Sequence, residues 1–114
     1  MDSVRRSVSA AEWETRVDLA ACYRLCALYG WVDFIFTHIS ARVPGTTHYL
    51  INPFGLLFDE VTASSLVKLD RDGAVLLDST GLGYNQGGFV IHGAVHEARA
   101  DAHWVMHLHT QEGV

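Results

Sequence analysis

The sequence has little cysteine, little proline and no long apolar run, and these shortages exclude several classes of protein. The two cysteines, Cys22 and Cys26, lie four residues apart in a predicted helix, a spacing that suits neighbouring core thiols and is poor for a disulfide. No window approaches the roughly 20 apolar residues that a membrane span needs, and no apolar signal segment follows the N-terminus. We therefore expect a cytoplasmic protein with no membrane partner.

Positive charge is also scarce. The chain has 8 Lys and Arg against 13 Asp and Glu, which gives a net charge of -5. The basic residues are scattered, so nothing favours a polyanion through counterion release, and no nucleic-acid partner is expected. With 49% hydrophobic and 18% charged residues, residues 1–114 are expected to form one compact unit.

The N-terminal third predicts one long helix. Ser9 and Glu12 form a capping-box pattern, in which the serine oxygen and the glutamate each satisfy a free amide. The helix is expected to run to about Tyr29 and to end at Gly30. Arg16 is expected on its polar side. The apolar positions that predict its buried stripe are Trp13, Val17, Ala20, Ala21, Leu25 and Leu28.

The remaining two thirds predict mostly β structure. Two hairpins are expected, one across 34–51 and one across 67–77, because β-branched and aromatic runs flank turn residues there. A glycine-rich loop at 79–88 leads into a predicted helix over 89–100 and a strand over 103–109. With no internal repeat and no linker, one α+β unit is the natural interpretation.

Histidine is over-represented, with seven in the chain, and five of them lie between 92 and 109. In a strand, His107 and His109 would lie on one face, where two imidazoles can converge on one metal ion. The alternative is that both are surface or hydrogen-bonded structural histidines, and spacing alone leaves the two interpretations about even.

The other histidines favour structural roles. His92 and His96 lie one helical turn apart and could bind a metal, but Gly93 follows the first of them where the zinc-protease motif has glutamate. We expect both to pack or hydrogen-bond between helix and sheet. His38 and His48 fall on predicted hairpin strands, where structural roles are favoured still more.

Taken together, four stretches resemble the class II aldolase/adducin family. They are Phe36–Val43, Leu50–Lys68, Asn85–His96 and Val105–Thr110. The resemblance implies an α/β/α sandwich around a mostly antiparallel central sheet with flanking helices, usually assembled as a tetramer. It also implies a small carbonyl or sugar-derived substrate, with Asn52, Gly55 and Asn85 at substrate-binding positions.

In the family's enzymes, the resemblance implies that His107 and His109 bind zinc or a similar divalent ion, together with a third histidine much further along the chain. The ion acts as a Lewis acid on the substrate's carbonyl and hydroxyl oxygens, and a nearby glutamate moves the proton. Two imidazoles and one unseen ligand suit zinc, iron, manganese or cobalt alike.

This sequence departs from that pattern in three ways. The position of the acid/base glutamate is Gly88. The small polar residues of the phosphate-binding loops are replaced by Thr37-His38, Phe54-Gly55 and Gln86-Gly87. The chain stops five residues after His109. The first two departures favour the adducin-like branch of the family, and the third leads us to expect the N-terminal portion of a longer domain.

Three hypotheses follow. The chain belongs to a metal-dependent aldolase-like lyase whose base comes from elsewhere, such as His92, Glu97, a metal-bound hydroxide or another subunit. Alternatively, it is a non-catalytic adducin-like oligomerisation domain, or an incomplete domain that is inactive and self-associates.

Overall fold

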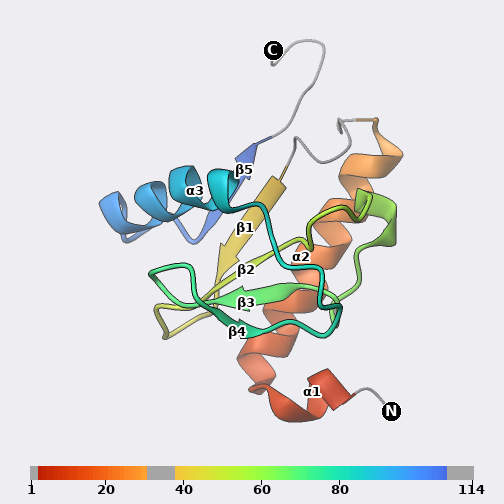
Figure 1. The fold of residues 1–114 in the computed structure, drawn as a ribbon, viewed down its shortest axis with the longest axis horizontal. Coiled ribbons are helices and arrows are strands. Elements are labelled where there is room, and N and C mark those ends of the chain that lie inside the picture. Colours follow the sequence, from red (N-terminus) through yellow and green to blue (C-terminus); the bar gives the residue numbers. More distant parts are fainter. Residues whose placement is uncertain (1–2, 31–37, 108–114) are drawn as a thin grey trace.

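The computed structural model describes residues 3–30 and 38–107 (Figure 1). Helix α1 covers Ser3–Ser7, which the sequence did not predict, and α2 covers Ala10–Leu28. The later elements are β1 (His38–Arg42), β2 (Tyr49–Ile51), the 3-10 helix η2 (Phe58–Glu60), β3 (Val67–Leu69), β4 (Val75–Leu77), α3 (Gln86–Ala98) and β5 (Trp104–His107). No helix in these described ranges is long and apolar enough to cross a membrane.

The five strands form one sheet in the order β4-β3-β2-β1-β5, and every neighbouring pair is antiparallel. The two predicted hairpins are confirmed by the β1–β2 and β3–β4 pairs. Strand β5 lies at the edge beside β1, although more than 60 residues separate them in sequence. This pairing brings His107 to the start of β1.

Helices α2 and α3 cover opposite faces of the sheet, which confirms the predicted α/β/α arrangement. Side chains alternate between faces along a strand. Ile39, Ala41 and Leu50 therefore join the core under α2. On the other face, Tyr49 and Ile51 pack with Phe89 of α3.

The start and end of α2 confirm the sequence-based bounds. The Ser9 hydroxyl accepts a hydrogen bond from the Glu12 amide at 3.0 Å, and Gly30 has a φ of 73° beyond the helix end. The second half of the capping box was wrong, because the Glu12 carboxylate turns to Arg16 and Lys68 instead, at 2.9 Å each. Cys22 and Cys26 are free thiols, as expected.

Most of the predicted buried stripe of α2 was also wrong, since only Ala20 of its six residues is buried. Arg16 is fully buried, whereas Val17, Leu25 and Leu28 are exposed. The Arg16 guanidinium bonds to the Glu12 carboxylate and to the carbonyls of Ala63 and Leu66. A buried charge with such partners is tolerated, so the inward face instead carries Glu12, Thr15, Arg16, Leu19, Ala20, Tyr23 and Cys26.

Helix α3 begins three residues earlier than predicted. Asn85 is its N-cap and accepts a hydrogen bond from the Gly88 amide at 3.1 Å. Gly87 and Gly88, which the sequence placed in a loop, thus lie in its first turn. The residues of α3 that face the sheet are Gly88, Phe89, His92 and His96. Of these, Gly88, His92 and His96 lie at the candidate site, and Phe89 packs in the apolar core.

Candidate functional site

The β1–β5 pairing brings His38 and His107 together. They are direct partners in the ladder, so their side chains lie on the same face, which is the one that α3 covers. Their rings meet edge to face, with centroids 5.0 Å apart and an interplanar angle of 89°. His38 is buried, whereas His107 is exposed. The other half of the predicted metal pair, His109, lies outside the described residues.

Behind these two imidazoles runs a buried chain of hydrogen bonds. His38 Nδ1 lies 2.6 Å from His92 Nε2, and His92 Nδ1 lies 2.6 Å from Ser40 Oγ. Ser40 Oγ lies 2.9 Å from His96 Nε2, and His96 Nδ1 lies 2.8 Å from the Ala102 carbonyl oxygen. We call these four side chains, His38, His92, Ser40 and His96, the histidine relay. The expectation that His92 and His96 hydrogen-bond between helix and sheet is therefore confirmed.

Burial keeps His92 and His96 of the relay uncharged. It lowers the pKa of His92 to about 3, with smaller contributions from the imidazoles of His38, His96 and His107. Burial also lowers the pKa of His96, against the opposing effect of its bond to the Ala102 carbonyl. Both are thus neutral imidazoles near pH 7, each with one donor and one acceptor nitrogen.

Gly88 lies directly against His38. A Cβ added at Gly88 would lie 2.6 Å from His38 Nε2, closer than real Cβ atoms come to a neighbour. At the adjacent Gly87, the nearest contact would be an ordinary 3.5 Å. The imidazole of His38 therefore occupies the space that a side chain at position 88 would need.

The three expected substrate-binding residues occupy different environments. Asn52 is buried, and its side-chain oxygen accepts a hydrogen bond from Tyr23 at 2.9 Å. Gly55 lies in an exposed turn with a φ of 90°. Asn85 caps α3 one turn from His38's neighbour, Gly88. Of the three, Asn85 belongs to the helix end that borders the relay.

Glu97, considered above as a base, lies in the last turn of α3. Its carboxylate is exposed and forms an ion pair with Arg71 at 2.6 Å. Nine residues separate it from Gly88, or roughly 13 Å along a helix. The structure therefore brings His92, but not Glu97, to the His38–His107 contact.

The donor chemistry at this edge fits a divalent metal ion. His107 is an exposed imidazole, and neutral imidazoles are ligands for zinc and similar ions. Within residues 3–30 and 38–107, no three His, Cys, Asp or Glu side chains gather as a metal site, so further ligands would come from outside these ranges.

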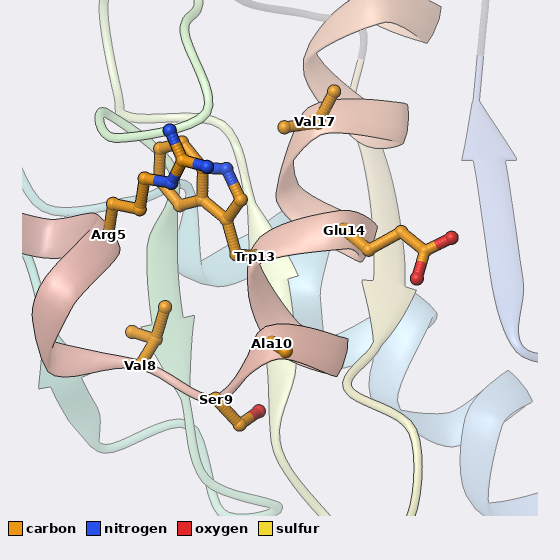
Figure 2. Close-up of a pocket in the computed structure, with 7 residues that line it drawn as sticks. All are labelled: Arg5, Val8, Ser9, Ala10, Trp13, Glu14 and Val17. Carbon is orange, nitrogen blue, oxygen red and sulfur yellow. The ribbon is translucent and has the colours of Figure 1, made fainter.

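A separate hollow of about 500 Å³ lies between α1 and the start of α2 (Figure 2). In it the Arg5 guanidinium lies over the Trp13 ring, 5.7 Å from the ring centroid. None of the site residues expected from the sequence lines this hollow, which adjoins α2 and not the relay.

Sequence reasoning missed His38 and Ser40 as parts of the site. The available signal was that two departures from the family pattern, His38 and Gly88, occur together. Considered separately, each of these two departures indicated only that a group present in the family is missing. The structure shows that His38 and Gly88 are in contact.

Comparison with known proteins supports the resemblance. The profile of the Class II Aldolase and Adducin N-terminal domain matches residues 17–114. A protein of Pseudomonas aeruginosa, named as a candidate class 2 aldolase, is 63% identical over 97% of this chain and 42% of its own length. Mouse alpha-adducin is 52% identical over 86% of this chain and 14% of its own length.

Solved structures agree with the observed fold. The crystal structure of an aldolase II superfamily protein from Pseudomonas syringae has a TM-score of 0.96 and 61% identity, covering 98% of this chain and 45% of that one. An L-fuculose 1-phosphate aldolase from Glaciozyma antarctica has a TM-score of 0.79 and 29% identity, covering 99% and 45%. The chain thus spans less than half the length of its bacterial relatives.

Proposed function

Because the chain belongs to the class II aldolase and adducin N-terminal domain family, we propose that it is the N-terminal part of a metal-dependent lyase for a small carbonyl or sugar-derived substrate. The observation that carries this proposal is the exposed imidazole of His107 beside the buried, hydrogen-bonded His38. The similarity to an L-fuculose 1-phosphate aldolase supports the reaction class.

His107 and His109 would hold the ion, and we expect zinc first. A divalent ion bound there supplies Lewis acidity toward the oxygens of a carbonyl substrate. The protein's own side chains provide orientation. The histidine relay holds His38 in place, and the His38 ring in turn restricts the His107 ring beside it. The substrate contacts expected at Asn52, Gly55 and Asn85 remain predictions, as does assembly into a homo-oligomer in the cytoplasm.

Both side chains considered for proton transfer, His92 and Glu97, have hydrogen-bonded partners in the structure. His92 is 1% exposed, and both of its ring nitrogens are hydrogen-bonded within the relay. Glu97 is ion-paired at the far end of α3. We propose that His92 holds His38 in place and that Glu97 stabilises the helix surface.

Metal analysis of the purified full-length protein tests this function. We expect about one divalent ion per subunit, retained through gel filtration. The His107→Ala variant should lose the ion. The His48→Ala variant should keep it, because His48 lies beyond the end of β1 that is opposite to His107. A full-length protein with no ion, indistinguishable from its His107→Ala variant, would contradict the proposal.

A second candidate function is a non-catalytic adducin-like oligomerisation domain. It is favoured by Gly88 and by 52% identity to mouse alpha-adducin, against 29% identity to the L-fuculose 1-phosphate aldolase. Sedimentation at several concentrations, combined with turnover assays on panels of aldehydes and hydroxy acids, separates the two. Reproducible turnover that His107→Ala abolishes would exclude the scaffold function.

A further inference from the structure

A second hollow, of about 300 Å³, lies at the end of β1 that is opposite to His38. Strand β1 places Arg42 there and His38 at its other end, roughly 14 Å away along the strand. We call this cavity the arginine hollow. Its polar lining comes from Arg42, Thr47, Tyr49, Arg71, His96 and Glu97.

The Arg42 guanidinium lines the hollow and forms no ion pair with a carboxylate among the residues that the structure describes. Its Nη2 donates to the His96 carbonyl at 2.6 Å and its Nη1 to the Ala100 carbonyl at 3.2 Å. These bonds cover carbonyls at the negative, C-terminal end of α3, and they use two of the five N–H donors of the guanidinium. The buried Nε has no partner in the same part of the chain. Capping α3 therefore leaves most of the Arg42 donors unused.

Arg71 reaches the hollow from the turn between β3 and β4. Its Nε and Nη2 both donate to one oxygen of Glu97, at 3.2 and 2.6 Å, so within the described ranges three of its five donors are also unused. Because His96 is neutral, two cations and one carboxylate line the hollow, in a chain whose net charge is -5. The hollow therefore has a local surplus of positive charge and of hydrogen-bond donors.

We propose that the arginine hollow binds a small oxyanion, of the phosphate or carboxylate type, between the guanidinium groups of Arg42 and Arg71. Such an anion supplies the acceptor oxygens that the hollow lacks, and the forked guanidinium matches its geometry. The hydroxyls of Thr47 and Tyr49, to which no other described residue hydrogen-bonds, supply further donors. The site lies apart from the proposed metal centre and does not rest on the proposed function.

Calorimetric titration of the purified full-length protein with inorganic phosphate, and separately with acetate, tests the site. We expect one ion to bind per subunit in at least one of the two titrations, and the tighter anion identifies the ligand type. Ionic strength is held constant with sodium chloride, because salt screens such contacts. If neither anion binds saturably at millimolar concentrations, the proposal is wrong.

Arg71→Gln tests whether the anion lies in the hollow. The substitution removes one of the two guanidinium groups, so the affinity should fall about tenfold. Arg42 is kept because it also caps α3. The matched control is Arg99→Gln, which removes the same charge from an exposed ion pair with Asp101, outside the lining of the hollow. Equal affinities of the two variants would overturn the proposal, and this is the result expected if the anion binds only at a metal ion.

Glu97→Gln should have the opposite effect. The amide keeps the shape of the side chain, removes the negative charge beside the anion and releases the Arg71 donors, so the affinity should rise about threefold. Asp101→Asn removes the carboxylate of the exposed pair outside the hollow and should leave the affinity unchanged. A Glu97→Gln variant that binds the anion no more tightly than Asp101→Asn would contradict a location between Arg42 and Arg71.

Discussion

The two faces of the sheet use the same strand for different purposes. Along β1, Ile39 and Ala41 point into the apolar core under α2, while His38 and Ser40 point into the polar relay under α3. Among the residues that the structure describes, the α2 face has one buried ionic cluster, Arg16 with its partners, and it stabilises the fold. The α3 face has directional hydrogen bonds that end at the candidate site. Strand alternation therefore separates packing from chemistry within one five-residue strand.

The largest effect is expected on the α2 face. Arg16→Ala would leave the buried Glu12 carboxylate with Lys68 alone and deprive the buried Leu66 carbonyl and the partly buried Ala63 carbonyl of their donor. Removing one partner of a buried ion pair costs about 3–5 kcal/mol. Urea denaturation of the full-length protein should show a loss of this size, with the metal content per folded molecule unchanged.

Arg24→Ala is the matched control, because Arg24 lies on the exposed side of α2 and donates to one carbonyl, that of Val61. Its loss should cost no more than about 1 kcal/mol. Equal losses from the two substitutions would show that the buried cluster contributes nothing special to the α2 face.

The next largest effect tests the contact across the α3 face. Gly88→Ala forces a methyl group onto the His38 ring, and overpacking of this kind costs about 1–3 kcal/mol. In a His38→Ala background the same substitution should cost little, since the ring is gone. Gly87→Ala, whose Cβ meets only an ordinary contact, should leave stability unchanged or raise it by up to about 1 kcal/mol. If Gly88→Ala lowered stability equally in both backgrounds, His38 and Gly88 would not be energetically coupled.

Most of the fold could be predicted from the sequence because it follows from local chemistry. Ser9 and Gly30 mark the two ends of α2, and the two hairpins follow from turn residues between β-branched runs. The inward face of α2 could not be predicted from hydrophobicity, because Arg16 is buried by hydrogen bonds to Ala63 and Leu66, some 50 residues away. Such partners leave no periodic signal in the sequence.

The candidate site, like the fold, could be predicted from the sequence only in part. A strand was predicted over residues 103–109, and β5 (Trp104–His107) confirms it within the described residues. The contact of His38 with Gly88 depends on β1 packing against the first turn of α3. The sequence assigned that turn to a loop, because glycines at 87 and 88 are poor helix formers, whereas the Asn85 cap and the contacts with the sheet hold it helical.

A smaller effect on stability, which depends on pH, should also distinguish the α3 face of the sheet from the α2 face. The pKa of His92 and of His96 is lowered in the fold, so the unfolded chain binds protons that the native state does not. Stability is therefore complete above the unfolded value of about 6.5. As the pH decreases toward the native His92 pKa of about 3, this residue alone costs up to about 1.4 kcal/mol per pH unit. The lowered pKa of His96 adds a loss in the same direction. The charged or titratable groups acting on the pair are His38, Arg42, His103 and His107.

Urea midpoints between pH 7.5 and 4.5 measure this loss above most of the carboxylate range. His96→Gln should lessen the slope, whereas His48→Gln, which removes an imidazole outside the relay, should not. A flat profile in the wild type would mean that the relay accepts protons without cost.

The smallest expected effect lies within α3 itself, where the buried and exposed sides of one helix can be compared. Glu97→Gln removes an ion pair with Arg71 whose side chains are 60% and 51% exposed, and exposed pairs contribute little because water and salt screen them. The variant should keep its urea midpoint, its bound metal and any turnover. Loss of turnover with unchanged stability and metal content would instead return Glu97 to the candidates for proton transfer, because only a chemical role would leave folding and metal binding intact.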